Sequence, residues 1–353
     1  MDIKHWFDGN SHSPLIIAGP CSAESEEQVT ATATALAAIP EVGLFRAGVW
    51  KPRTRPDGFE GKGAEALNWL SKIQQTTGLS TIVEVATPSH VEQCLKHGIS
   101  AVWIGARTVV NPFSVQQLAD ALQGTQTPVF IKNPVTPDLK LWIGAFERMR
   151  KAGLKYLAAI HRGFHHYSEK PYRNHPMWEM SMKLDRIIGV PIITDISHIC
   201  GCRELLADTA QKAVDMATDG LMIEVHTTPE QALTDAQQQI TPMQLETLLK
   251  DIVWRSKSSV DNKSLLAMRA EIDDIDSEIL SLLARRMGLS CSIGELKKQN
   301  GMAAFQPERW KQILSEHIDA GKSLNLSEEL VTNVFEAIHK ASVEAQTDIL
   351  SRN

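Results

Sequence analysis

Between Leu15 and about Ile252, short apolar runs alternate eight times with longer amphipathic stretches, a pattern that few folds can accommodate. The runs are rich in β-branched residues and are often opened by Pro or Gly, a pattern typical of buried parallel strands. We predict strands at 15–19, 43–47, 80–84, 101–105, 128–132, 156–161, 191–195 and 221–225. Helices fit between them, for example at 63–76, 89–97, 137–152 and 203–217. Eight β-then-α units over roughly 240 residues predict an α/β fold, a (β/α)₈ TIM barrel, with an open doubly wound sheet as the alternative.

The pattern changes near Trp254. Residues 255–263 are polar and carry no periodic apolar residue, which predicts a linker between a barrel domain at 1–254 and a helical domain at 264–353. We predict the helices of the second domain at 264–299, 307–320 and 327–350. A small all-α helical domain of this kind buries little core alone, so we expect it to form a homodimer.

Charge and cysteine content narrow the class of protein. Lys plus Arg total 36 against 42 Asp plus Glu, a formal net charge of −6, which argues against nucleic acid and anionic membranes as partners. No stretch reaches the ~18 apolar residues of a membrane span, and the first residues lack the apolar core of a signal peptide. Five scattered cysteines predict a reduced, cytoplasmic protein without a disulfide framework.

Polar residues gather where the predicted strands end, which is where barrel enzymes carry their chemistry. Six cations at these strand ends predict a binding site that suits phosphate and carboxylate groups: Arg46, Lys51, Arg53, Arg107, Lys132 and Arg162. One thiol, one imidazole and two carboxylates are candidate ligands of one divalent metal: Cys21, His198, Glu224 and Asp235. Each residue taken singly is more often a buried hydrophobe or a solvated charge, but their shared position in the topology favours a site.

The remaining cysteines and a group of three histidines give weaker indications of function. Cys200 and Cys202 form a Cys-x-Cys motif, but no second motif of this kind is present to complete a metal site. We therefore interpret both cysteines as structural. Cys94 and Cys291 fall within helical patterns and are expected in the core. Three histidines without regular ligand spacing predict a loop near anions: His161, His165 and His166.

Six motifs in this order resemble 3-deoxy-D-arabino-heptulosonate 7-phosphate (DAHP) synthases of the short type I form. They are Gly-Pro-Cys-Ser at 19–22, Phe-Arg at 45–46 followed by Lys-Pro-Arg-Thr at 51–54, Gly-Ala-Arg at 105–107, Arg-Gly at 162–163, Asp-Ile-Ser-His at 195–198 and Ile-Glu-Val-His at 223–226. The resemblance spans most of residues 15–240. One departure is His161, which stands before Arg162 where many relatives have Glu.

The resemblance implies a role for each matching residue. The metal ligands would be Cys21, His198, Glu224 and Asp235. Phosphoenolpyruvate would be held by Arg107, Lys132 and Arg162, with Arg46 and Lys51 completing its site. Erythrose 4-phosphate would be received by Lys51, Pro52, Arg53 and Thr54. Among metals we expect Mn²⁺ first, with Fe²⁺, Co²⁺ and Zn²⁺ as alternatives.

The implied reaction joins phosphoenolpyruvate to the aldehyde of erythrose 4-phosphate, adds water and releases phosphate, with the metal as Lewis acid. Lys51 is our candidate general acid, and a metal-bound water is its rival. The rival enzyme is the related synthase for an eight-carbon sugar acid phosphate. The Lys-Pro-Arg-Thr motif argues against that rival.

The C-terminal segment places cations on an apolar helix stripe. At 100° per residue, Arg286 and Lys297 lie within about 40° of Ile275, Ile279 and Ile293. Long cationic side chains commonly snorkel at a core edge, but two cations without acidic partners on that stripe favour an anionic ligand. Ser342 and Gln346, four residues apart on the last predicted helix, are placed to reach the same cavity.

Five short motifs follow one another in this segment: Leu-Leu-Ala-Met-Arg at 265–269, Leu-Leu-Ala-Arg-Arg at 282–286, Gly-Glu-Leu-Lys at 294–297, Pro-Glu-Arg at 307–309 and Ser-Val-Glu-Ala-Gln at 342–346. With these motifs in register, the segment resembles the all-helical chorismate mutases over 264–350. The resemblance implies that one dianion, chorismate or its product prephenate, is gripped by Arg286, Lys297 and Arg309, with Arg269 contributed by the partner chain of a dimer. Ser342 would add a hydrogen bond, and Lys297 and Gln346 would face the ether oxygen in the rearrangement. Gln306 and Trp310 stand where relatives usually have Asp and Glu, which keeps a non-catalytic dimerisation and sensor module as the alternative.

Regulation is expected to pass through the same segment. The first predicted strand begins at Leu15, and no insertion between strands is long enough to form an effector domain. We therefore expect prephenate or chorismate to inhibit the synthase through the C-terminal domain. The alternative is a flexible linker that joins the two enzymes without transmitting inhibition between them.

Overall fold

The computed structural model describes residues 3–8, 13–51, 58–165, 171–255 and 263–352. Its contacts divide the chain into two compact units, Met1–Lys257 and Ser258–Asn353, which we call the barrel unit and the helical unit. The predicted linker falls largely on 256–262, outside the described residues, so its extent stays a prediction. Lys263, assigned to the linker from sequence, is the first residue of a helix.

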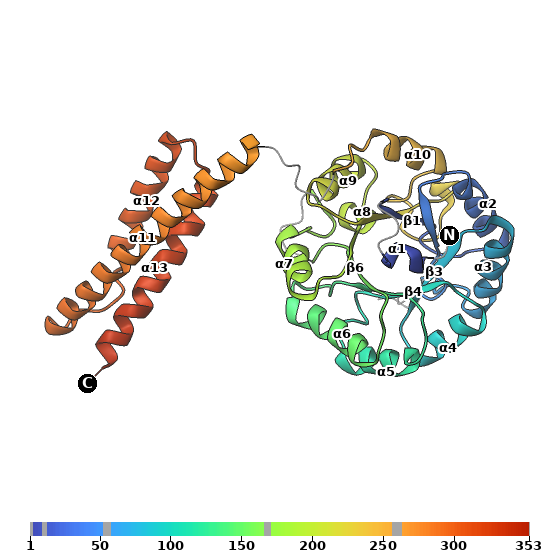
Figure 1. Ribbon diagram of the computed structural model, residues 1–353, viewed down its shortest axis with the longest axis horizontal. Coiled ribbons are helices and arrows are strands. Elements are labelled where there is room, and N and C mark those ends of the chain that lie inside the picture. Colours follow the sequence, from blue (N-terminus) through green and yellow to red (C-terminus); the bar gives the residue numbers. More distant parts are fainter. Residues whose placement is uncertain (1–2, 9–12, 52–57, 166–170, 256–262, 353) are drawn as a thin grey trace. The chain divides into compact units, whose positions relative to one another are not determined.

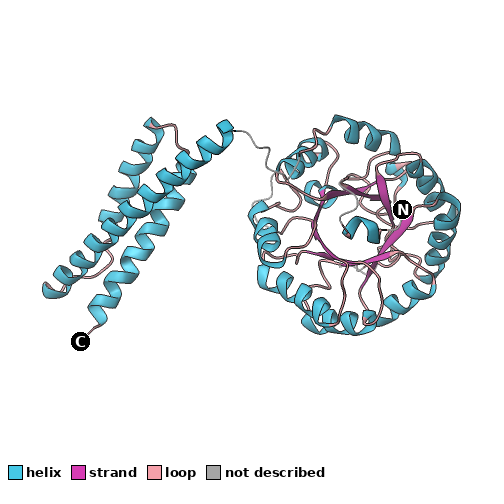
Figure 2. Cartoon of the chain, viewed as in Figure 1, coloured by secondary structure: helices cyan, strands magenta, loops and turns pink. Residues whose placement is uncertain are grey.

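The strands of the barrel unit form one closed, parallel barrel in sequence order (Figures 1 and 2). They are β1 Leu15–Gly19, β2 Val42–Arg46, β3 Ser80–Val85, β4 Ala101–Ile104, β5 Val129–Lys132, β6 Leu157–His161, β7 Ile192–Asp195 and β8 Gly220–Glu224. The barrel closes where β8 pairs with β1, with Gly19 opposite Glu224. The predicted barrel is confirmed, and the open-sheet alternative is wrong.

Helices follow the strands and surround the barrel. They are α2 Glu26–Ala37, α3 Ala64–Thr77, α4 Pro88–Lys96, α5 Pro112–Leu122, α6 Leu139–Lys151, α7 Trp178–Ile188, α8 Ile196–Cys200, α9 Leu206–Asp215 and α10 Pro242–Asp251, with a 3₁₀ turn at Pro229–Gln231. Local sequence sets several of their starts. Thr87, Asn111 and Thr241 each cap a helix whose first position is proline, because the side-chain oxygen accepts a backbone N–H while proline lacks one.

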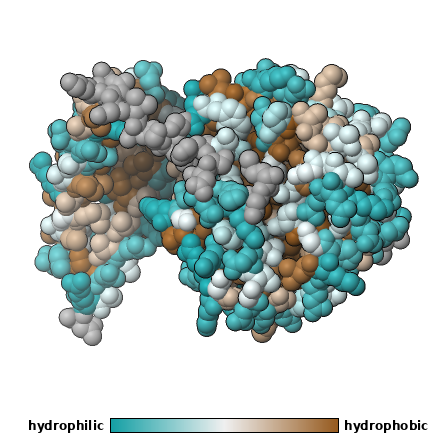
Figure 3. Space-filling model, turned by 45° about the vertical axis from the view of Figure 1, so that its right-hand side comes forward, coloured by the Kyte–Doolittle hydropathy of each residue, from teal (hydrophilic) through white to brown (hydrophobic). Residues whose placement is uncertain are grey.

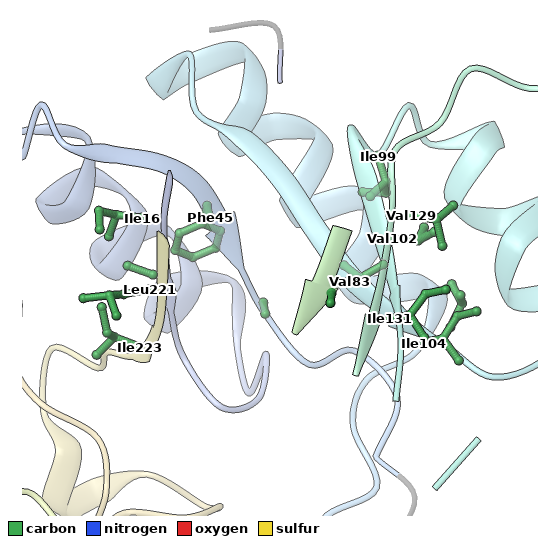
Figure 4. Packing of buried hydrophobic residues seen from close by; sticks show 14 of the residues in the cluster. Ile16, Phe45, Val83, Ile99, Val102, Ile104, Val129, Ile131, Leu221 and Ile223 are labelled. Carbon is green, nitrogen blue, oxygen red and sulfur yellow. The ribbon is translucent and has the colours of Figure 1, made fainter. Parts of the chain in front are cut away.

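Two apolar layers hold the barrel, because side chains alternate between the two faces of a strand. Residues such as Ile16, Leu221 and Ile223 face outward and pack with the surrounding helices (Figure 4). The other set fills the interior: Leu15, Ile17, Leu44, Ile82, Ala101, Trp103, Phe130, Ala158, Ile160, Ile193 and Met222. The short helix α1 (Lys4–Phe7) adds Trp6 to this interior set, so it covers the end of the barrel where the strands begin.

Ionisable side chains end five of the strands, above the apolar interior. They are Arg46, Lys132, His161, Asp195 and Glu224, each at most 4% exposed. Because all eight strands are parallel, their carboxyl ends meet at one rim, and charges far apart in sequence become neighbours there.

The helical unit consists, in its described residues, of α11 (Lys263–Gln299), α12 (Pro307–Ser323) and α13 (Glu328–Ser351). These bounds lie within three residues of the prediction. Few apolar side chains are buried here, Val331 and Ile349 among them, and many remain exposed on α11, so hydrophobic surface is visible on this unit in Figure 3. Cys291 is exposed on α11 in the single chain, so its prediction as a core residue is wrong, whereas Cys94 is buried as predicted.

No helix in the described ranges combines the length and the apolar character that a membrane span requires.

Candidate active site

A cavity of about 560 Å³ opens at the carboxyl ends of the strands. Its lining comes from several elements: Lys51, Glu84, Ala106, Arg107, Lys132, Val135, Arg162, His165, Arg173, Asn174, His198 and Asp235. Four of the six predicted cations line this cavity. Arg46 is fully buried in the same layer, and Pro52, Arg53 and Thr54 lie outside the described residues.

The predicted metal ligands come together. Donor atoms of Cys21, Glu224 and Asp235 all lie within 4.8 Å of one another, and His198 Nε2 lies 3.9 Å from Glu224 Oε1. The closure of β8 on β1 brings Glu224 beside the loop that carries Cys21. Lys51 Nζ lies 3.2 Å from Cys21 Sγ, so a cation borders the cluster.

Protonation differs within this cluster. Burial, followed by the charge of Glu224, raises the pKa of the Cys21 thiol to about 12, so the sulfur is protonated at neutral pH. Burial also opposes ionisation of Asp235, but Arg173, His198 and Lys51 outweigh it and lower the pKa of that carboxyl to about 2. The cluster therefore offers an ionised carboxylate and a thiol that becomes a ligand on losing its proton.

Arg46 and Glu224 form an ion pair beneath the cavity, with Nη2 3.0 Å from Oε1 and both side chains at most 1% exposed. The guanidinium also lies 5.2 Å from the ring centre of Trp103. Its Nε and Nη1 have no hydrogen-bond partner within the described part of the chain. Burial disfavours the Glu224 anion, but Arg46 and His198 outweigh burial, and the pKa of Glu224 is lowered.

A second buried chain links Lys132, Asp195 and His198. Lys132 Nζ lies 2.8 Å from Asp195 Oδ2, and His198 Nδ1 lies 2.9 Å from the same oxygen. Burial disfavours the charged aspartate, yet His198 and Lys132 together hold its pKa well below the usual value. Burial lowers the pKa of His198, so its neutral ring donates from Nδ1 to Asp195 and keeps the lone pair of Nε2 free.

Arg162 is held in place by two asparagines. Asn133 Oδ1 accepts its backbone N–H at 2.7 Å, and Asn174 Oδ1 accepts from Nη1 at 2.6 Å. Burial is the largest cause that lowers the pKa of Arg162 to about 10, and the nearby charges of Arg173 and Arg107 act in the same direction. Arginines crowded around one cavity in this way are stabilised by a bound anion.

Three polar residues that line the cavity were not predicted from the sequence: Glu84, Arg173 and Asn174. Glu84 is the penultimate residue of β3, and its carboxylate accepts a hydrogen bond from Trp103 Nε1 at 2.9 Å. A carboxylate at the end of a predicted strand is a signal that could have identified this residue. Arg173 and Asn174 lie in the segment between β6 and α7, which carries no periodic pattern.

The three histidines predicted to lie in a loop near anions differ in their positions. His165 lines the cavity, as a loop near anions predicts, and His166 lies outside the described residues. His161 contradicts that prediction, because it is the last residue of β6, fully buried and edge-on to Trp178. Burial lowers its pKa to about 4, so it is a neutral core histidine.

The helical unit has a cavity of about 410 Å³ of its own. Its lining comes from all three helices and the α11–α12 loop: Arg286, Leu289, Ser290, Ile293, Lys297, Ala304, Gln306, Arg309, Trp310, Ile313, His339, Ser342, Val343 and Gln346. Arg269 is exposed on α11 and does not belong to this lining. Three arginine or lysine side chains thus face one cavity whose described lining includes no carboxylate.

Neutral side chains orient two of these cations. Arg286 Nη1 donates to Ser342 Oγ at 2.7 Å, and Lys297 Nζ donates to Gln346 Oε1 at 3.0 Å. Both cations are partly buried in the single chain, where apolar residues of the same stripe such as Ile275 and Ile279 are exposed.

Trp310 fills its side of the cavity by stacking on His339, with ring centres 4.0 Å apart and planes 12° from parallel. Burial, with Arg286 and Lys297 adding to it, lowers the pKa of His339. Trp310 and His339 therefore form an aromatic wall of this cavity.

The closed barrel and the cationic cavity at its strand ends define a (β/α)₈-barrel enzyme with a cationic site. The chain belongs to the DAHP synthetase I family, whose sequence model matches residues 2–262. Residues 268–347 match the chorismate mutase type II family.

Individual relatives agree with this division. The chain is 28% identical over 246 residues to phospho-2-dehydro-3-deoxyheptonate aldolase of Thermotoga maritima, covering 70% of each chain. It is 26% identical to 2-dehydro-3-deoxyphosphooctonate aldolase of Syntrophotalea carbinolica, covering 69% of this chain and 91% of that one. A crystal structure of the Thermotoga maritima enzyme superposes with a TM-score of 0.62 at 25% identity and covers 68% of each chain.

The C-terminal part has its own relative. It is 40% identical over 91 residues to the bifunctional chorismate mutase/prephenate dehydratase of Buchnera aphidicola subsp. Acyrthosiphon pisum. The match covers 26% of this chain and 24% of that protein.

Proposed function

We propose that the barrel unit condenses phosphoenolpyruvate with erythrose 4-phosphate and water to give DAHP and phosphate. The observation that carries this proposal is a cavity that joins five cations to a cluster of one thiol and two carboxylates. One substrate presents a carboxylate and a phosphate, and the other presents a phosphate and an aldehyde, which this combination of charges suits.

The cluster fits a divalent metal, because one thiol and two carboxylates converge and the His198 imidazole lies 3.9 Å from Glu224 Oε1. Cys21, His198, Glu224 and Asp235 would hold it, with Mn²⁺ as our first choice over Fe²⁺, Co²⁺ and Zn²⁺. When bound, the metal supplies Lewis acidity toward an aldehyde oxygen.

The chain's own residues would orient the reactants. Arg107, Arg162 and Lys132 would hold the carboxylate and phosphate of phosphoenolpyruvate, and Asn133 and Asn174 fix the direction of Arg162. Lys51 Nζ borders both the cavity and Cys21, so it would donate the proton to the new hydroxyl. By resemblance, Pro52, Arg53 and Thr54 would receive erythrose 4-phosphate.

Substrate choice tests this proposal against its nearest rival, since relatives of both kinds match the chain. We expect condensation of phosphoenolpyruvate with erythrose 4-phosphate to exceed that with arabinose 5-phosphate by at least about tenfold in kcat/KM, a difference of about 1.4 kcal/mol in transition-state binding. Product sugar acid formed from each aldehyde at matched concentrations is the measurement. A preference for the five-carbon aldehyde would favour the eight-carbon synthase.

For the helical unit we propose rearrangement of chorismate to prephenate. Its cavity offers three cations for the two carboxylates and places Lys297 beside Gln346, the pair proposed to face the ether oxygen. A non-catalytic sensor remains the second candidate, favoured by the lack of any carboxylate among the described lining residues and by the Trp310–His339 wall.

We further propose that two chains pair through the helical unit. Apolar side chains along α11 are about half exposed in the single chain, among them Ile272, Ile275 and Ile279. Such a stripe favours burial against a second copy. Pairing would also bring Arg269 of the partner chain to the cavity.

Regulation is the fourth part of the proposal: prephenate bound in the helical unit inhibits the barrel. We expect prephenate to lower DAHP formation by full-length protein about 5- to 150-fold at saturation, which is the range of coupling free energies of about 1–3 kcal/mol. Initial rates are measured across a prephenate titration for full-length protein, a chain ending at residue 258 and full-length Arg286→Ala. Equal inhibition of all three would contradict the mechanism.

A further inference from the structure

The loop after β8 contacts both buried members of the metal cluster through two adjacent glutamines. Gln238 Nε2 donates to Glu224 Oε2 at 2.6 Å. Gln239 Oε1 accepts the backbone N–H of Cys21 at 3.0 Å. Both glutamines are at most 1% exposed, and Asp235 belongs to the same loop. This loop, residues 234–239, therefore touches or supplies three of the four candidate ligands.

The amide of Gln238 can point only one way. Its Oε1 accepts from Arg173 Nη1 at 2.8 Å, while its Nε2 donates to Glu224. An arginine can only donate and an ionised carboxylate can only accept, so a flipped amide would oppose both neighbours. Gln238 thereby holds Oε2 of Glu224, while Oε1 lies 3.0 Å from Arg46 Nη2 and 3.9 Å from His198 Nε2.

The same contacts hold Asp235. This residue has a φ of 47°, a left-handed conformation that a non-glycine residue keeps only when its surroundings impose it. The backbone N–H of Gln238 donates to the Asp235 carbonyl at 3.2 Å, and Arg173 Nη1 donates to Asp235 Oδ1 at 3.2 Å. Arg173 thus links Asp235 to Gln238, and Gln238 links both to Glu224.

We propose that Gln238 is a positioning residue for the metal site, which orients Glu224 and, with Arg173, Asp235. This inference rests on the metal centre of the proposed function. Without the amide, Glu224 Oε2 is buried with no donor from this loop, and the carboxylate can turn about its remaining ion pair, in which Arg46 Nη2 lies 3.0 Å from Oε1. A turned carboxylate offers the metal a poorer ligand, so metal affinity falls although every ligand is retained.

Direct metal binding tests the role of Gln238. Full-length protein is stripped of metal and titrated with Mn²⁺, and free Mn²⁺ is followed by electron paramagnetic resonance for wild type, Gln238→Leu and Gln237→Ala. Gln237 is the exposed neighbour in the same loop and serves as the matched control. We expect Gln238→Leu to weaken Mn²⁺ binding about 10- to 100-fold and Gln237→Ala to bind as wild type does.

Two further readouts separate positioning from a general structural role. The unfolding temperature in chelator reports the fold without metal, and Gln238→Met replaces Gln238→Leu should the leucine variant not fold. DAHP formation by the variant should need more Mn²⁺ for half-maximal rate yet approach the wild-type kcat at excess Mn²⁺.

The outcomes are distinct. Mn²⁺ binding by folded Gln238→Leu or Gln238→Met at wild-type strength would overturn the role of Gln238 and leave the proposed function standing. Failure of the wild type to bind Mn²⁺, Fe²⁺, Co²⁺ or Zn²⁺ would overturn the metal centre and this inference together.

Discussion

Cys21→Ala is expected to reduce DAHP formation by about three orders of magnitude or more, with no recovery on adding divalent metal. Loss of a Lewis acid removes several kcal/mol of transition-state stabilisation, and each 1.4 kcal/mol corresponds to about tenfold in rate. The wild type in chelator should lose activity to the same extent and regain it with metal. DAHP formation and bound metal are measured on the same samples.

Cys94→Ala is the matched control for this prediction. Cys94 is also buried and burial raises its pKa to about 12, but it lies in α4 and does not line the cavity. Chorismate loss by the separate helical unit reports on protein quality in every sample. Full synthase activity of wild type in chelator would remove the metal from the mechanism.

The protonated thiol also sets the direction of the pH dependence. Because burial raises the pKa of Cys21 to about 12, the thiol holds its proton at neutral pH and must release it to ligate a metal. Apparent metal affinity should therefore increase with pH, by about tenfold per unit well below that pKa. Proton release on metal addition, measured in weak buffer, should be present in wild type and reduced in Cys21→Ala.

Arg286→Ala is expected to lower kcat/KM for chorismate by about two to three orders of magnitude. The guanidinium is oriented by Ser342 toward a cavity of cations, and its removal leaves a substrate carboxylate without its partner. Lys297→Ala should lower kcat/KM for chorismate by a similar factor. The measurement is the loss of chorismate absorbance, with DAHP formation in chelator-free buffer as the check on folding.

Arg285→Ala is the control, because Arg285 is the exposed neighbour on α11. No chorismate turnover by the wild type itself would favour the sensor module. Prephenate binding by wild type and its loss in Arg286→Ala would then show that the cavity is retained for sensing.

Mixed dimers extend this experiment to the proposed pairing. When Arg269→Ala and Arg286→Ala chains are combined at random, half of the dimers hold one intact site, so about a quarter of wild-type activity should return. Two variants that stay inactive after mixing would contradict a site shared between chains.

Much of the fold was predictable because its signals are local. A buried parallel strand shows as a short β-branched run and a helix shows as a 3.6-residue period, so the eight strands and the three C-terminal helices were placed to within about three residues. The site followed in part from the same pattern. Parallel strands end at one rim, so Arg46, Lys132 and Glu224 were predicted to be neighbours from their positions alone.

Other contacts depended on the tertiary structure. Strand order is not encoded in periodicity, so only the pairing of β8 with β1 established closure and placed Glu224 near Cys21. Arg173 and Gln238 lie in irregular segments, and their contacts depend on how loops far apart in sequence converge. His161 and Cys291 were misplaced for a related reason, because a local pattern does not specify what packs against a residue.

Hydrophobic periodicity is a local signal, so the sequence specified the order of the elements, the eight β-then-α units and the residue types where the strands end. The pairing of side chains, the retained proton of the Cys21 thiol and the contacts of Gln238 and Arg173 with the cluster followed from the folded chain. These properties arise from burial and from distances between residues remote in sequence.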